Sequence, residues 1–236
     1  MDTKTKDGDE NATPLIIASR NGNLDCVKIL LSFEADIEAR GTVKANTDEA
    51  VEDCSPSWVA AATGHVVKLL IDHKEEVNGR NATNSTPLRV AAYDGRLDIV
   101  SYVVENGADV NSRDEFESTP LMITCYKGHM DVASYLILHG ANHHLKDNNG
   151  DTCLHYAEEK GHIEVVGRLL SLGVKEEQNH KCLTPLLVAS SELNLSHDKE
   201  SQSADLEEQE LDELYFDIAT GKLRARREGN VDLQRP

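Results

Sequence analysis

Hydrophobic residues recur along the chain in blocks that have helical spacing. In residues 119–151, Val132, Tyr135 and Leu136 fall on one face of a helix and are expected to be buried against neighbouring units. A shorter helix precedes them and ends at Gly128, a residue that readily takes the left-handed conformation that terminates helices. Each block therefore predicts a pair of short helices.

The blocks begin at nearly regular intervals with a Thr-Pro-Leu-like tripeptide. Threonine is a good N-cap, and proline suits the first helical position because its missing N–H is not needed there. The openings are Thr13-Pro14-Leu15, Thr86-Pro87-Leu88, Thr119-Pro120-Leu121, Thr152-Cys153-Leu154 and Thr184-Pro185-Leu186. From Thr86 onward they are 33, 33 and 32 residues apart, and a weaker opening, Ser55-Pro56-Ser57, precedes Thr86 by 31. This period predicts a solenoid of one repeated helical unit, which favours a binding protein over an enzyme.

Two irregularities interrupt the period in the second repeat. Thr13 and Ser55 are 42 residues apart, about nine more than one repeat, so we expect a long inserted loop at about 41–54. The stretch Gly64–Leu70 is also shorter than its counterpart Gly161–Leu170, which removes part of a turn from the second helix. We expect the second repeat to be the most weakly packed.

Charge narrows the class of partner. The chain carries 24 basic and 42 acidic residues, a net charge of −18, which disfavours binding to nucleic acid and favours basic partners. The alternative, that the acidic residues mainly keep a solenoid soluble, stays open. No apolar stretch is long enough to span a membrane, and residues 1–10 lack the apolar region of a secretory signal. We expect a cytoplasmic protein, with the nucleus left open.

We find no basis for predicting catalysis, a metal or a cofactor. Neither a P-loop, a GxGxxG segment nor an HExxH motif occurs. His143, His144, Cys153 and His155 match no usual spacing of zinc ligands. The cysteines form no CxxC pair and are expected to be reduced, small core residues: Cys26, Cys54, Cys125, Cys153 and Cys182.

The repeat unit resembles the ankyrin repeat, most clearly in TPLIIA from Thr13 and TCLHYA from Thr152. The resemblance implies an all-α ankyrin-repeat solenoid of about five repeats over residues 11–190, after a disordered segment at residues 1–10. It also implies that histidines at repeat-template positions have structural, hydrogen-bonding roles. These histidines are His65, His129, His155 and His162.

The regular repeat fails after Ser190. The tail, residues 191–236, begins with a stretch rich in Ser, Asp, Glu and Gln, and a basic cluster at Lys222–Arg227 follows it. We expect it to be mostly disordered, with a short amphipathic helix over Glu207–Ile218. The last repeat then lacks its usual second helix and cap.

A candidate peptide site lies on the exposed face of the first helices. Asp94 follows Tyr93 at the end of one first helix, and Tyr126 holds the equivalent place one repeat on. A carboxylate beside aromatic rings can hold an arginine or lysine side chain by a charge pair and cation–π contact. Arg89 is placed to meet a terminal carboxylate, and Ser85 is expected to be exposed on the same face. In the alternative interpretation, Asp94 caps a turn and the tyrosines pack between repeats.

A more specific resemblance is carried by NSTPLR at Asn84–Arg89 and YDG at Tyr93–Gly95, after the long insert. These segments resemble the Fem (feminization) family of ankyrin-repeat proteins. That family provides substrate receptors of elongin–cullin RING ubiquitin ligases, which recognise degrons at protein C-termini ending in or near arginine. The resemblance implies that Asp94 pairs with the degron arginine. It also implies that Ser85, Arg89, Tyr93 and Tyr126 line the pocket.

Two departures from the Fem pattern set the limits of this hypothesis. The family's Phe-Asp-Gly segment in the insert is replaced by Lys44–Asp48, so only Asp48 can supply the second acid. The family's elongin-binding box is not visible in residues 191–236. The expected partners are a protein with a basic, arginine-containing C-terminus and, through the ligase, elongin B/C and a cullin. The alternative is a plain ankyrin scaffold or regulator without a ligase link, including a truncated family member.

Overall fold

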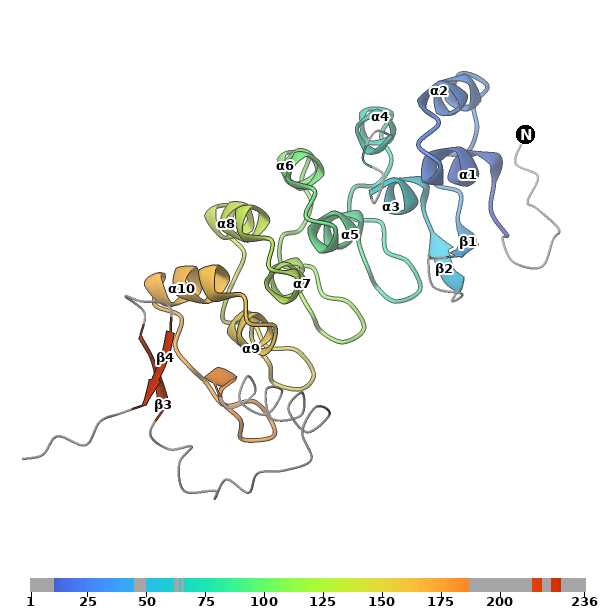
Figure 1. Ribbon diagram of the computed structural model, residues 1–236. Helices are drawn as coiled ribbons and strands as arrows, with labels where there is room; N and C mark the ends of the chain where they lie inside the picture. The colour runs from blue at the N-terminus through green and yellow to red at the C-terminus, as the bar shows by residue number, and fades with distance from the viewer. Residues whose placement is uncertain are drawn as a thin grey trace, which may run out of the picture. The chain divides into compact units, whose positions relative to one another are not determined.

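The computed structural model describes most of the repeat region and two short segments of the tail. The described residues are 11–44, 50–61, 64, 66–186, 214–217 and 222–225. The chain forms two units, residues 1–189 and 190–236. The first unit consists of two layers of helices that alternate along the chain, with loops projecting from the first-helix layer (Figure 1).

The first helix of each repeat begins at its Thr-Pro-Leu opening, as the sequence predicts. The side chains of Thr13, Thr86 and Thr119 accept hydrogen bonds from the backbone N–H three residues on, and proline follows each threonine. These helices are α1 (Pro14–Arg20), α3 (Pro56–Ala61), α5 (Pro87–Tyr93), α7 (Pro120–Lys127) and α9 (Cys153–Glu159). Pro185 and Leu186 are also helical, at the fifth complete opening.

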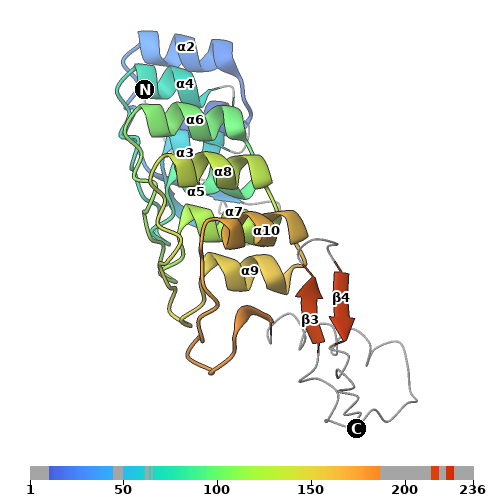
Figure 2. The same ribbon diagram turned by 90° about the vertical axis from the view of Figure 1, so that its left-hand side faces the viewer.

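The second helices form the other layer and stack in chain order (Figure 2). They are α2 (Leu24–Ser32), α4 (Val67–Asp72), α6 (Leu97–Glu105), α8 (Met130–Leu138) and α10 (Ile163–Ser171). Four of them have nine residues, whereas α4 has six. The shortened second helix predicted for the second repeat is therefore confirmed.

One continuous core runs between the two layers. Leucines of the repeat openings and valines and leucines of the second helices are fully buried in it, among them Leu88, Val100, Val132 and Leu136. Tyr135, also predicted to be buried, is half-buried against this core. Each repeat thus buries its apolar faces against its neighbours, which is how a solenoid gains stability.

The insert in the second repeat is a β-hairpin, which corrects the expectation of a loop at 41–54. Strands β1 (Gly41–Lys44) and β2 (Ala50–Cys54) pair antiparallel, with Val43 opposite Val51. Val43 and Cys54 are buried against α1 and α3 in a small second core. Gly41 is required there, because a Cβ at that position would lie 2.7 Å from the carbonyl oxygen of Asn11.

The described part of the tail is also a hairpin. Strands β3 (Leu214–Asp217) and β4 (Lys222–Ala225) pair antiparallel, with Phe216 opposite Leu223. The predicted helix over Glu207–Ile218 is therefore wrong at residues 214–217, and its other residues lie outside the described part. No helix among the described residues is long and apolar enough to cross a membrane.

Candidate functional site

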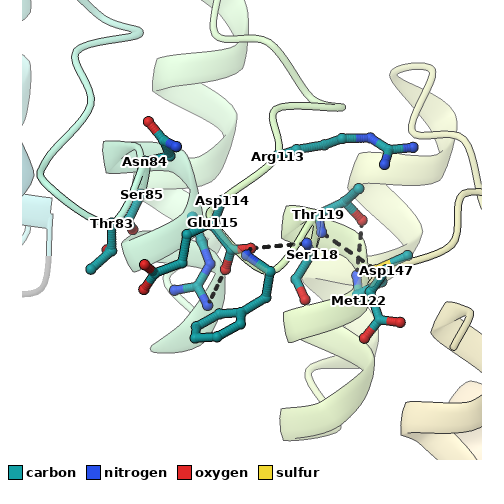
Figure 3. Close-up of polar contacts among 12 residues, drawn as sticks. Thr83, Asn84, Ser85, Arg113, Asp114, Glu115, Ser118, Thr119, Met122 and Asp147 are labelled. Carbon is teal, nitrogen blue, oxygen red and sulfur yellow. Dashed lines mark hydrogen bonds and ion pairs between the residues drawn. The ribbon is translucent and has the colours of Figure 1, made fainter. Parts of the chain in front are cut away.

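A repeated hydrogen-bonding motif shapes the loop before each first helix. Five residues before each regular opening, an Asp or Asn side-chain oxygen accepts hydrogen bonds from two backbone N–H groups, two and four residues on. The four residues are Asn81, Asp114, Asp147 and Asn179. Figure 3 shows the bond from the Ser118 N–H to Asp114. The motif fixes each loop and leaves the second side-chain atom available for another contact.

That second contact differs at each repeat. The Oδ2 atom of Asp114 lies 2.8 Å from a terminal nitrogen of Arg89, and Asp147 accepts a hydrogen bond from the hydroxyl of Tyr156 at 2.7 Å. The Nδ2 atom of Asn81, by contrast, is buried and has no hydrogen-bond partner among the described residues. The loop before α5 is therefore the least satisfied of the described loops that share this motif.

Ser85 and Arg89 lie at the start of α5, beside this loop. The expectation that Ser85 is exposed is wrong: it is buried because it enters α5 beside the loop, where its backbone N–H donates to Asn81, but its Oγ has no partner in the described part of the chain. The guanidinium of Arg89 is half-buried and paired with buried Asp114. The charge of Arg89 is therefore already balanced within the protein, and a peptide carboxylate would share it with Asp114.

Tyr93 and Asp94 lie at the opposite end of α5. Both are exposed, as predicted for a binding face, and Tyr93 keeps 44% of its surface accessible. No cation of the described residues lies within ion-pair distance of Asp94. Partial burial raises the pKa of Asp94, while the positive charges of Arg96, His129 and Lys127 act in the opposite direction. Asp94 is thus a carboxylate that would gain from pairing with a ligand cation.

Lysines of the following repeats cover the tyrosine rings. The ammonium of Lys127 lies 4.0 Å from the ring centroid of Tyr93 and 5.9 Å from that of Tyr126. Lys160 lies 4.8 Å from the Tyr126 centroid, and its ammonium also pairs with Glu159. The aromatic faces expected to hold a ligand cation therefore already carry cations of the protein.

Three of the four repeat-template histidines make the structural hydrogen bonds that the sequence predicts. The Nε2–H of His129 donates to the carbonyl oxygen of Tyr93 at 3.0 Å, and the same bond joins His162 to Tyr126. Each ring lies where a Cβ on the glycine of the preceding repeat would be, at Gly95 for His129. His155 hydrogen-bonds Thr152 within its own repeat. His65 lies outside the described residues.

Four of the six predicted site residues (Ser85, Arg89, Tyr93 and Asp94) lie on or next to α5, Tyr126 lies on α7, and these five do not converge on a single pocket. Ser85 and Asp94 are nine residues apart on either end of α5, which corresponds to about 13 Å at 1.5 Å per residue. A pocket of about 420 Å³ lies nearby at the loop bases but contains none of the six predicted residues. It is lined by Arg80, Asn84, Asp109, Asn111, Ser112, Arg113, Asp114 and Glu117. Asp48 lies outside the described residues.

The sequence interpretation missed Asp114 as the partner of Arg89. The regular placement of the Asx residue five positions before each opening would have revealed it. The cysteine prediction is partly wrong: Cys54, Cys125 and Cys153 are buried, whereas Cys26 and Cys182 are exposed, and all five are free thiols. Among the described residues, no three His, Cys, Asp or Glu side chains are placed to hold a metal ion.

Comparison with known proteins supports both resemblances. The family described as ankyrin repeats (3 copies) matches residues 39–114 and 111–182, and the single ankyrin repeat matches residues 10–42. The chain is 45% identical over 78 residues to the protein fem-1 homolog CG6966 of Drosophila melanogaster. It is 40% identical over 79 residues to the sex-determining protein fem-1 of Caenorhabditis elegans.

Each of these matches covers 32% of this chain and 12% of the relative, so the chain matches only a small part of either protein. The resemblance to Fem proteins is confirmed over about a third of the chain. The ankyrin-repeat matches extend over residues 10–182 of the 236, well over half of the sequence. The chain belongs to the ankyrin-repeat family.

Proposed function

We propose that this chain is a receptor for protein C-termini that carry arginine. The observation that carries the proposal is Asp94, an exposed carboxylate that directly follows exposed Tyr93 and has no ion-pair partner among the described residues. A guanidinium can pair with a carboxylate through two hydrogen bonds and stack on an aromatic ring at the same time. Ankyrin-repeat modules bind proteins, and the net charge of −18 favours basic partners.

The length of α5 suggests how a peptide would lie. An extended chain advances about 3.3 Å per residue, so about four residues would run from Asp94 to the buried hydroxyl of Ser85. Phe116, on the loop that carries Asp114, is exposed and offers an apolar surface to a bound peptide. Tyr126 extends the aromatic surface into the next repeat, where its ring meets Tyr156 edge-on at 6.1 Å.

We further propose that the chain acts as the substrate-recognition subunit of a cullin-RING E3 ubiquitin ligase and is recruited through elongin B/C. The support is the resemblance of the NSTPLR–YDG segment to the Fem family and the similarity to two fem-1 proteins over about a third of the chain. Co-purification with elongin B/C and a cullin tests this part. Peptide binding without elongin binding would instead favour an ankyrin scaffold without a ligase link.

Peptide titration tests the recognition step directly. A peptide ending in arginine is titrated by calorimetry against the wild type, Asp94→Asn and a control, Asp131→Asn, which removes an exposed acid from α8 in the second-helix layer. We expect Asp94→Asn to weaken binding by about 2–5 kcal/mol, the typical cost of breaking a desolvated charge pair, and Asp131→Asn to have little effect. Equal losses of affinity in both variants would mean that the peptide responds only to the overall negative charge, and would contradict the assignment of Asp94 to the binding site.

A further inference from the structure

Lys127 occupies the position of Asp94 one repeat further on. The two residues are 33 positions apart, each after the tyrosine of its first helix. The ammonium of Lys127 reaches back to the Tyr93 ring at 4.0 Å, and no carboxylate of the described residues lies within ion-pair distance of it. The cation next to Asp94 and Tyr93 is therefore the protein's own.

A ligand guanidinium would compete with this ammonium for the same ring face. Arginine has the advantage, because its planar and weakly hydrated group stacks on rings and pairs with carboxylates through two bonds. Lys127 is half-exposed, and its four-carbon stem can move the ammonium away without disturbing the backbone of α7. Entry of a ligand arginine thus leaves a displaced ammonium close to the bound peptide.

The charge balance then depends on where the arginine lies in the ligand. An internal arginine adds one positive charge beside the displaced Lys127. A C-terminal arginine adds the same charge together with its own carboxylate, one side-chain length away and within reach of the lysine stem. Arg89 is a weaker partner for this carboxylate, because it is paired with Asp114 at 2.8 Å and lies about one and a half turns from Asp94 along α5.

We propose, on the basis of the function proposed above, that Lys127 determines specificity at this site. The ligand arginine displaces the Lys127 ammonium from the Tyr93 ring, and the ammonium then pairs with the free carboxylate of the ligand arginine. The site consequently selects arginine at the last position of a protein over arginine within the chain.

The test is a cycle of two peptides and two proteins. A peptide ending in arginine is prepared with a free carboxylate and as the C-terminal amide, and both are titrated against the wild type and Lys127→Met. We expect the wild type to prefer the free acid by about tenfold, corresponding to one charge-assisted contact. In Lys127→Met the preference should vanish, and the amide should bind at least as tightly as it binds the wild type, because the competing ammonium is gone.

A matched control separates this role from a general effect of charge. Lys68→Met removes another lysine that lies over a tyrosine ring, 5.2 Å from the Tyr102 centroid in the second-helix layer, and should leave the acid preference intact. An acid preference that persists in Lys127→Met would assign the carboxylate to another residue. Equal binding of acid and amide by the wild type would overturn the role of Lys127 while leaving arginine recognition standing. Failure of both peptides to bind the wild type would overturn both proposals.

Discussion

The second and third repeats differ at two core positions that face each other. In the third repeat, Leu88 follows the Thr-Pro opening and Ala108 follows the turn after the second helix, and both are buried. The second repeat has Ser57 and Glu75 at these positions, and both are equally buried. A large and a small apolar residue have thus been replaced by a small and a large polar one.

The two changes compensate for one another. The longer side chain of Glu75 reaches the space that leucine fills elsewhere, and its Oε1 accepts a hydrogen bond from the backbone N–H of Ser57 at 2.8 Å. That N–H belongs to the first turn of α3, where a negative charge is favoured. The compensation is incomplete, because Oε2 of Glu75 is buried without a hydrogen-bond partner in the described part of the chain.

The comparison shows that the repeat period constrains the shape of a unit more strongly than its chemistry. A polar pair can replace an apolar pair if volume is conserved and hydrogen bonds are made, but a half-satisfied buried carboxyl reduces stability. Since α3 packs against α5, the stability of the second repeat bears on the helix that carries Tyr93 and Asp94. We expect the second repeat to unfold locally before the other repeats do, which would interrupt the cooperative unfolding of the solenoid.

Introducing only the glutamate of the polar pair into the third repeat should have the largest effect on stability. Ala108→Glu places a carboxyl against Leu88, which occupies the space and cannot donate a hydrogen bond. We therefore expect it to lower the free energy of unfolding by at least about 4 kcal/mol. The control, Ala82→Glu, is at an exposed turn and should change it by less than about 0.5 kcal/mol. Urea denaturation followed by circular dichroism measures both.

Adding the serine of the polar pair to the Ala108→Glu variant should recover part of the lost stability. Leu88→Ser combined with Ala108→Glu recreates the arrangement of Ser57 and Glu75, and we expect a favourable coupling of about 1–3 kcal/mol between the two substitutions. If the double variant is no more stable than the sum of the single effects, the polar pair of the second repeat is not self-compensating.

Glu75 should also make the stability of the second repeat depend on pH in a way that the third repeat, with Ala108 at the same position, does not share. Burial raises the pKa of Glu75 to about 7, and nearby Glu38 adds to the increase, while hydrogen bonds from Ser57 and Ser55 oppose it. Because the folded pKa exceeds the unfolded value of 4.5, the folded state holds its proton more tightly. The associated stability is present below about pH 4.5 and is lost as the pH rises through about 7, a change of about 3 kcal/mol.

The neutral variant Glu75→Gln isolates this contribution. Glu158, whose pKa burial and Glu176 also raise to about 7, titrates in the same window and contributes equally to both proteins. The difference in unfolding free energy between Glu75→Gln and the wild type should therefore grow in favour of the variant from pH 5 to pH 8. A difference that does not change with pH would show that Glu75 does not titrate in this range.

The sequence predicted the solenoid well because its helices depend on local features. Thr-Pro openings, terminating glycines and helical spacing act within a few residues, and the shorter α4 followed from counting residues alone. The β1–β2 hairpin was missed because its pairing is fixed by tertiary burial of Val43 and Cys54 on α1 and α3. In the tail, the apolar spacing around Leu214 suited a helix or a strand, as short runs do, and the structure has a strand.

The site was predicted in part for the same reason. Exposure of Tyr93 and Asp94 followed from their place in the repeat and is confirmed. The contacts that define their chemistry come from other repeats: Lys127 reaches the Tyr93 ring, and Asp114 holds Arg89 from the next loop. Such pairs depend on how neighbouring units stack, which the sequence of one unit does not contain.

Restoring the apolar pair in the second repeat should give the smallest change, with the opposite sign. Ser57→Leu combined with Glu75→Ala reproduces the core of the third repeat, and we expect it to raise the free energy of unfolding at pH 7 by about 2 kcal/mol. Each single variant should instead destabilise, because Ser57→Leu crowds Glu75 and Glu75→Ala leaves a cavity and an unpaired N–H. Urea denaturation measures the net effect, and amide exchange in α4 should slow relative to α6 in the double variant. A double variant less stable than the wild type would mean that the polar pair stabilises this repeat, and that the shortened α4, rather than Glu75, distinguishes it from the third.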